Sequence, residues 1–357
     1  MSGVIRLLQD IVRIPSVSGE EEACRDHLVT WFQQHDVNAW ASGRNVIAVV
    51  EGEQPAADAE HGLLLLTHID VVPVGPGWTR EPWDGALEND CVWGRGSNDA
   101  KSSAAAMAWT AAHMDRSRMR GRLVVVLACD EETGGEGIEA CVDELPGYTA
   151  AVVGEPTGLA VCPGQRGLFR ATIEVEGRQC HASRPWEGVN AIELAARDIL
   201  AVQGLDLGEA DDMLGPATLQ CTVIEGGTKP NVLPGACTIE LDGRPTPTCD
   251  NARMQQLLEG AVSSTVHIRS NRFEPVRVDP EAPIVRVTRG ASPKGELGRF
   301  GGVSDLFHVR HVPGVVMGPG TSEASHAPDE WVAVSQVEAA AAAYDRIAHT
   351  WLGDEEV

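Results

Sequence analysis

The chain has 357 residues, 43% hydrophobic and 22% charged, which is ordinary for a soluble globular protein and long enough for two domains. Fifty-two Asp and Glu against 28 Lys and Arg give a formal net charge of -24, which repels phosphate backbones and anionic lipid surfaces and excludes nucleic acid and membranes as expected partners. Nine scattered cysteines without a CxxC pair, no signal-peptide pattern and no apolar run near the ~20 residues of a membrane span predict a cytoplasmic protein without disulfides.

The first part of the chain alternates helical segments with short apolar strands. Apolar residues from Val4 to Val12 recur at helical spacing until Pro15, and Ser18 with Glu21 resembles a capping box for a second helix through Phe32. Further segments follow in alternation, with strands predicted at 46–50, 63–66, 123–129 and 151–153 and helices at about 102–114 and 136–144. This alternation predicts an α/β sheet covered by helices.

After residue 164 the pattern changes to strands with one polar face. We predict strands at 169–175, 218–223 and 238–241 and helices at 191–202 and 252–263, which together indicate a separate α+β module. We interpret the proline-rich segment 273–283 as a linker that returns the chain to the first domain. An apolar run at 315–317 and a helix at 336–351 then complete the first sheet. We therefore expect one domain of residues 1–165 plus 279–357 and an inserted domain of residues 166–278.

Residue types that bind metals directly follow three of the predicted buried strands. LLLL leads to His68 and Asp70, VVVLAC leads to Glu131 and Glu132, and AAVV leads to Glu155. Open α/β sheets place their sites at the carboxyl ends of their strands. These side chains are therefore candidates for a single site.

Each candidate also has a plainer interpretation when taken alone. In an extended segment Asp70 shares a face with His68 and can accept its ring N–H, but a lone surface or core histidine is equally common. Asp99 follows a Gly-rich turn and precedes a helix, where a carboxylate can serve as an N-cap. Glu131 and Glu132 are either a buried pair that needs a cation or an exposed acidic turn.

Several ordered segments together resemble a known family. HIDVVPVG, PWDGALENDCVWGRGSNDAK, DEETGGEG, VVGEPTG, HASRPWEGVNA, NVLPG, GGVSD and GPGTSEASHAPDEW occur in this order over nearly the whole chain. They resemble the zinc aminoacylase and exopeptidase family that includes acetylornithine deacetylase, succinyl-diaminopimelate desuccinylase and carboxypeptidase G. Ala100 and Ser102 depart from the Met and Gly that relatives commonly carry, which leaves the pocket shape open.

The resemblance implies a zinc-exopeptidase-like catalytic domain, with a central mixed sheet flanked by helices, and an inserted α+β ferredoxin-like lid and dimerisation domain. It also implies two divalent metal ions, zinc foremost with cobalt or manganese as alternatives. One ion would be bound by His68, Asp99 and Glu155, and the other by Asp99, Glu132 and His326, with Asp99 bridging the two.

The same resemblance implies the catalytic and binding roles. Glu131 is expected to act as general base toward a metal-bridging water, Asp70 to orient His68, and His181 to stabilise the oxyanion, usually in the partner subunit's site. For Arg244, one of the expected substrate contacts, a purely structural salt bridge is the alternative role, because arginine suits both roles. These expected contacts are Arg244, Asn231, Gly302 and Ser304.

The leading functional hypothesis is hydrolysis of the amide bond of N-acyl amino acids by a homodimer joined through the inserted domain, with an acetylornithine deacetylase-like activity. A desuccinylase of N-succinyl amino acids and a di- or tripeptide exopeptidase are the alternatives, because the same metals and base cleave either amide. A catalytically silent homologue is a third hypothesis, although all the metal and base positions are present.

Overall fold

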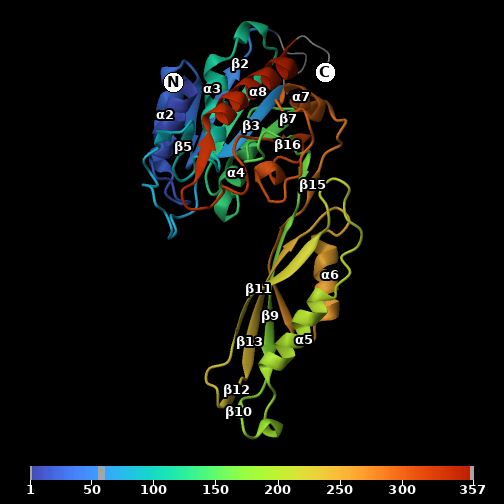
Figure 1. The fold of residues 1–357 in the computed structure, drawn as a ribbon. Helices are drawn as coiled ribbons and strands as arrows, with labels where there is room; N and C mark the ends of the chain where they lie inside the picture. Colours follow the sequence, from blue (N-terminus) through green and yellow to red (C-terminus); the bar gives the residue numbers. More distant parts are fainter. Residues whose placement is uncertain (1, 55–60, 354–357) are drawn as a thin grey trace. The chain divides into compact units, whose positions relative to one another are not determined.

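The computed structural model describes residues 2–54 and 61–353, and the chain divides into two compact units (Figure 1). The first unit takes in residues 1–164, 278–300 and 304–357. The second takes in residues 165–277 together with the short stretch 301–303. Each unit has its own hydrophobic core.

The first unit is built on a six-stranded mixed sheet. Its strands lie in the order β1 (Asn38–Ser42), β2 (Asn45–Glu51), β6 (Arg122–Ala128), β3 (Gly62–His68), β7 (Ala150–Val153) and β16 (Gly314–Val316). The pairs β1–β2 and β2–β6 are antiparallel, whereas β6, β3, β7 and β16 run parallel. Strand β3 is buried along its whole length, as the apolar run from Leu63 to Leu66 leads one to expect. The predicted α/β fold with a central mixed sheet is confirmed.

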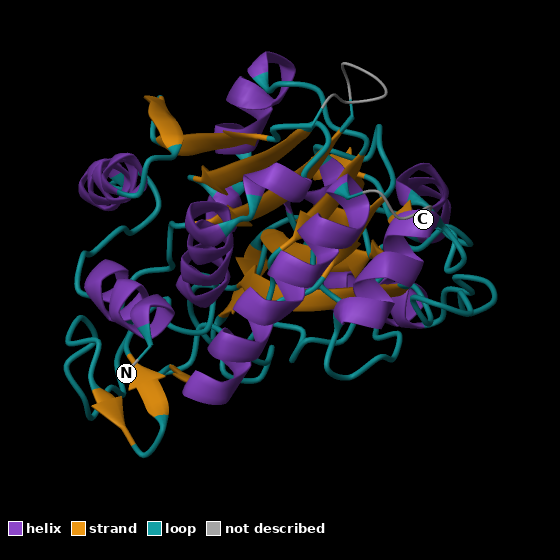
Figure 2. Cartoon of the chain, turned by 90° about the horizontal axis from the view of Figure 1, so that it is seen from above, coloured by secondary structure: helices purple, strands orange, loops and turns teal. Residues whose placement is uncertain are grey.

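Helices cover this sheet because strands that are apolar on both faces must be shielded from water (Figure 2). Helices α3 and α8 both pack on β3 and β6, and α1 packs on α3. Among the described residues the α-helices of this unit are α1 (Gly3–Val12), α2 (Glu22–Gln34), α3 (Lys101–His113), α4 (Glu136–Cys141), α7 (Pro283–Ala291) and α8 (Val334–Leu352). A small three-stranded sheet joins β17 (Trp331–Ala333), β5 (Cys91–Trp93) and β4 (Leu87–Glu88).

The second unit is an antiparallel four-stranded sheet with two helices. Its strand order is β11 (Thr218–Gly226), β13 (Ala236–Arg244), β9 (Leu168–Glu176) and β14 (Thr265–Phe273). With α5 (Ala191–Gln203) and α6 (Asn251–Ala261) the chain follows the β-α-β-β-α-β path of a ferredoxin-like module. Burial alternates along β9, so one face packs on the helices and the other is polar. Two-residue strands complete the set, namely β8 (Gly164–Gln165), β10 (Cys180–His181), β12 (Val232–Leu233) and β15 (Val276–Arg277).

One local expectation, the capping box, was wrong. Helix α2 begins at Glu22 without a side-chain cap, because the Ser18 hydroxyl donates to Asp70 and the Glu21 carboxylate pairs with Arg44. The chain passes from the second unit to the first between residues 277 and 278, inside the proline-rich segment, which also contains β15 and ends at Pro283, the first residue of α7. Proline suits the first turn of a helix, where its missing N–H has no partner to lose.

Candidate metal centre and active site

The register of the parallel strands brings two of the predicted ligands to the same level of the sheet. His68 is the last residue of β3 and lies opposite Ala128 of β6. Leu66 lies opposite Val153 of β7, so Glu155 is two residues beyond this pair, just as His68 is. His68 and Glu155 therefore emerge side by side at the carboxyl edge of the sheet.

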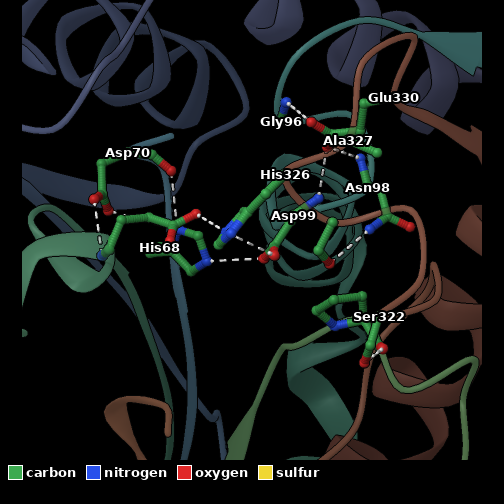
Figure 3. A network of polar contacts seen from close by, with 12 residues as sticks. His68, Asp70, Gly96, Asn98, Asp99, Ser322, His326, Ala327 and Glu330 are labelled. Atoms are coloured by element: carbon green, nitrogen blue, oxygen red, sulfur yellow. Dashed lines mark hydrogen bonds and ion pairs between the residues drawn. The ribbon is translucent and has the colours of Figure 1, made fainter. Parts of the chain in front are cut away.

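His68 is buried and has a defined partner on each ring nitrogen (Figure 3). Its Nδ1 lies 2.9 Å from the Asp70 carbonyl oxygen and 3.5 Å from the Asp70 carboxylate, and its Nε2 lies 3.3 Å from Asp99 Oδ1. An Nδ1–H that donates to the carbonyl leaves the Nε2 lone pair directed toward Asp99. The nearer acceptor is thus the backbone of Asp70 rather than the carboxylate that the sequence suggested.

The Asp70 carboxylate instead holds the turn that carries the two glutamates. It accepts hydrogen bonds from the backbone N–H groups of Glu131 and Glu132, each at 3.1 Å, and from Ser18 Oγ at 2.7 Å. Burial opposes ionisation, yet the attraction of the neighbouring His68 ring and the hydrogen bonds from Ser18 and Glu132 keep the pKa of Asp70 below its ordinary value. Asp70 therefore connects the end of β3 to the turn that follows β6.

Asp99 faces both histidines of the site. Its Oδ1 is near His68 Nε2, and its Oδ2 is 3.7 Å from His326 Nε2, which also lies 2.9 Å from Glu132 Oε1. Ligand atoms of His68, Asp99 and Glu132 all lie within 4.8 Å of one another. Helix α3 is preceded by Ala100 and has no side-chain cap, so the Asp99 carboxylate is not an N-cap.

Three further carboxyl groups near this cluster have pKa values raised by burial. Glu155 is 5% exposed, and among the described residues its Oε1 has no hydrogen-bond partner. Burial and neighbouring carboxylates raise the pKa of Glu155 and of Glu131 well above the usual range, while His68 opposes this shift. Burial also raises the pKa of Asp305 to about 7, and its Oδ2 is likewise without a partner in the described part of the chain. Additional positive charge at this position would counter these shifts.

The donor set fits divalent metal ions. Imidazole nitrogen and carboxylate oxygen are ligands that zinc, cobalt and manganese accept in proteins. The unpartnered oxygen of Glu155 is oriented without a protein donor, and a cation would satisfy it. A metal ion at this position would also relieve the repulsion between the buried carboxylates.

A second group of metal-binding residue types lies nearby but already has a cation. Glu21, Cys129 and Asp130 have ligand atoms within 4.8 Å of one another. The Arg44 guanidinium pairs with Glu21 Oε2 at 2.7 Å and also bonds Asp130. We therefore interpret this cluster as a structural ion-pair network that supports the turn before Glu131.

In the second unit, His181 and Asn231 lie together. Strand β10 pairs with β12, so that His181 is opposite Val232, and the N–H of Ala182 donates to the Asn231 carbonyl at 3.0 Å. The His181 side chain is exposed, with Nδ1 2.8 Å from Ser183 Oγ. This end of the unit thus carries an exposed imidazole beside an exposed amide.

Arg244 is the last residue of β13 in the four-stranded sheet, whereas His181 belongs to the separate two-stranded sheet of β10 and β12. Its Nε and Nη2 donate to the two oxygens of Asp242 at 2.8 and 3.2 Å, an arrangement typical of carboxylate binding by arginine. Strand β12, which pairs with β10, ends at Leu233, and β13 then runs from Ala236 to Arg244. Eight residue steps of an extended strand span about 26 Å. The second unit does not bring His181 and Arg244 together.

The two expected contacts of the GGVSD segment have different surroundings. Gly302 belongs to the stretch that groups with the second unit, whereas Ser304 belongs to the first. Ser304 is buried, and its hydroxyl accepts the N–H of Leu306 at 3.3 Å at the start of a short helical turn. Sequence reasoning missed two buried acids, Asp305 and Glu330, although both lie in segments quoted for the resemblance. What marks both residues is the burial of their carboxyl groups, and local sequence does not show whether an acid is buried.

Comparisons with known proteins agree with this architecture. A model of peptidase family M20/M25/M40 matches residues 64–350. A succinyl-diaminopimelate desuccinylase of Wolinella succinogenes is 31% identical and covers 94% of this chain and 96% of its own length. An acetylornithine deacetylase of Myxococcus xanthus is 30% identical over 82% of this chain and 80% of its own length. The solved structure of an M20 family metallo-carboxypeptidase from Sulfolobus solfataricus has the same fold, with a TM-score of 0.81 at 17% identity and coverage of 98% and 99%. The resemblance seen in the motifs is confirmed: the chain belongs to peptidase family M20/M25/M40 and is a hydrolytic enzyme.

Proposed function

We propose that the enzyme hydrolyses the amide bond of N-acyl amino acids with two divalent metal ions, zinc foremost. The proposed ligands are His68, Asp99 and Glu155 for one ion and Asp99, Glu132 and His326 for the other. The observation that carries the proposal is the placement of the Asp99 carboxylate between two imidazole Nε2 atoms, at 3.3 and 3.7 Å. A carboxylate in this position has one oxygen for each ion of a two-metal site.

Bound metal ions would supply positive charge that polarises the substrate carbonyl and makes a nearby water more acidic. Glu131 would accept the proton of that water as it attacks and return it to the leaving amine. Glu132 Oε1 is engaged by His326, whereas the Glu131 carboxylate has no hydrogen-bond donor among the described residues. The Asp70 bonds to both backbone N–H groups hold the main chain of the turn from which the two side chains extend.

Arg244 is proposed to bind the substrate carboxylate. Its contact with Asp242 shows that the guanidinium can present two donors to one carboxylate, and a substrate carboxylate would compete with Asp242 for them. Asn231, Gly302 and Ser304 are proposed as further polar contacts, with Ser304 acting through the turn that its hydroxyl caps.

His181 is proposed to stabilise the oxyanion in the site of a second copy. Within one copy, His181 pairs with β12, which comes just before β13, whereas Arg244 is the last residue of β13, about 26 Å along that strand from Ala236, so we do not expect one small substrate to contact both. A homodimer resolves this conflict, because each subunit then supplies a different end of residues 166–278. Strand β11 is an open sheet edge with exposed Val223 and Ile224, and α5 exposes Leu200, as a dimer surface requires.

The acyl group is proposed to be acetyl or succinyl. One relative is named for removal of a succinyl group and another for removal of an acetyl group, at 31% and 30% identity. Exopeptidase activity is the second candidate, favoured by the metallo-carboxypeptidase that shares the fold. A panel of N-acetyl and N-succinyl amino acids and di- and tripeptides, assayed with metal removed and restored, separates these activities. Metal-independent turnover, or no turnover of any acyl amino acid, would refute the leading proposal.

The cytoplasm is proposed as the working compartment. All nine cysteines are unpaired, which suits a reducing environment. Burial raises the pKa of the Cys129 and Cys141 thiols to about 12, so neither is a reactive thiolate at neutral pH. In the described ranges, 2–54 and 61–353, no helix combines the length and apolar character needed to cross a bilayer.

A further inference from the structure

A buried glutamate outside the predicted ligand set holds the segment that carries Asp99. Glu330 is 1% exposed, and its Oε1 accepts the backbone N–H groups of Asn98 at 2.9 Å and Asp99 at 3.0 Å (Figure 3). Its Oε2 accepts the N–H of Gly96 at 3.0 Å and Nη1 of Arg95 at 2.6 Å. One carboxylate therefore binds four donors within five consecutive residues, and it does so from a segment far along the chain.

The same contacts continue into the loop that carries His326. Arg95 Nη2 donates to the His326 carbonyl at 3.4 Å, and its Nη1 lies 3.5 Å from the Ala327 carbonyl. On the other side of the loop, Asn98 Nδ2 donates to Thr321 O at 3.0 Å, and Asn98 Oδ1 accepts the Thr321 N–H at 2.9 Å. The loop from residue 321 to residue 330 is thus tied to the Asp99 segment at both of its ends.

His326 depends on these ties for its position. Its side chain is 52% exposed, so packing alone does not fix it, and its backbone is in the left-handed region with φ 62°. His68 and Glu155, by contrast, follow directly from strands β3 and β7 and are buried. The distance between Asp99 and His326 is consequently set by loop-to-loop hydrogen bonds rather than by the sheet.

We infer that Glu330, together with Arg95, is a positioning residue that sets the spacing of Asp99 and His326 and thereby the affinity for the ion that uses both. This inference rests on the proposed two-metal function. The other ion would be held by His68, Asp99 and Glu155, and of these ligands only Asp99 lies in a segment that Glu330 and Arg95 hold. Loss of the Glu330 carboxylate should therefore weaken the ion at Asp99, Glu132 and His326 more than the other.

The test measures metal affinity directly rather than activity. Zinc is titrated into metal-free wild type and Glu330→Gln against a chromophoric chelator, which yields the two stepwise dissociation constants. The amide of Gln keeps the shape but places an NH₂ against backbone N–H donors. We expect one of the two dissociation constants to rise about 10- to 100-fold in the variant, as for other residues that orient metal ligands, with a smaller change in the other constant.

A matched control distinguishes positioning from general loss of stability. Asp211 in the second unit is also buried and binds one arginine, Arg277, and two backbone N–H groups, those of Met213 and Leu214. Asp211→Asn should lower the unfolding midpoint but leave both zinc constants unchanged. Arg95→Lys keeps the charge and removes the guanidinium contacts to the His326 loop, so it should weaken the binding of the same zinc ion. This variant decides the question if Glu330→Gln does not fold.

The outcomes separate the inference from the proposed function. Wild type that binds fewer than two zinc ions would refute the two-metal proposal itself. Two ions in wild type with unchanged or equally weakened constants in the folded Glu330→Gln variant, or in Arg95→Lys where that variant is used, would overturn the positioning role alone. A loss of zinc affinity in Asp211→Asn equal to that in the tested variant would also overturn it.

Discussion

Replacing Asp70 with Asn tests whether one carboxylate supports both the first histidine and the glutamate turn. The carboxylate is fully buried and accepts three hydrogen bonds, from Ser18 Oγ and from the backbone N–H groups of Glu131 and Glu132. In Asp70→Asn one oxygen becomes an NH₂, which cannot accept, so at least one of these donors loses its partner. A hydrogen bond to a charged group contributes about 1.5–3 kcal/mol, and a buried donor left unpaired adds to the loss.

We therefore expect Asp70→Asn to lower the free energy of unfolding of the metal-free protein by about 2–4 kcal/mol, measured by urea denaturation. Ser18→Ala is the matched control, because it removes one of the three donors and leaves the carboxylate and the glutamate turn intact. It should cost only about 1 kcal/mol. Equal stability losses in the two variants, or a loss in Asp70→Asn below about 0.5 kcal/mol, would refute the reasoning.

The remaining predictions concern catalysis, recognition and packing. Glu131→Gln should retain two zinc equivalents by elemental analysis but lose roughly 10²- to 10⁴-fold in kcat, and normal turnover would disprove the general-base role. Arg244→Lys should raise KM about 10- to 100-fold with little change in kcat, because Lys cannot reproduce the two-donor fork now bound to Asp242; an unchanged KM would favour a structural salt bridge. Tyr344→Phe removes the buried bond from Tyr344 Oη to Met317 O at 2.7 Å and should cost about 1–2 kcal/mol in urea unfolding, whereas wild-type stability would contradict it.

Much of the first unit followed from local sequence patterns. The apolar runs at 63–66 and 123–129 became the central strands β3 and β6, because a strand buried on both faces must be apolar throughout. The helix predicted from residue 336 became α8, which begins two residues earlier. Strand β1 and helix α7 were missed, since β1 is short and mostly exposed and α7 follows a proline-rich segment.

Local sequence patterns gave a wrong prediction where a residue from a distant segment binds a side chain that could otherwise cap a nearby helix. Ser18 and Glu21 have the residue types and spacing of a capping box. In the folded chain the Ser18 hydroxyl binds Asp70, and Glu21 binds Arg44 and the N–H of Asp130. A charged or buried partner offers a stronger hydrogen bond than an exposed helix end, so tertiary contacts prevailed.

The sequence by itself determined the family, the mixed α/β sheet and the positions of His68, Glu132 and Glu155 after buried strands. Only the tertiary structure decided how Asp99 and His326 meet, because neither follows a strand of the central sheet and their spacing depends on hydrogen bonds between loops distant in the chain. Periodicity reports which face of an element is buried, and this is a local property. Which buried acid pairs with which backbone N–H depends on the packing of the whole unit, and for that reason Glu330 became visible only in the folded chain.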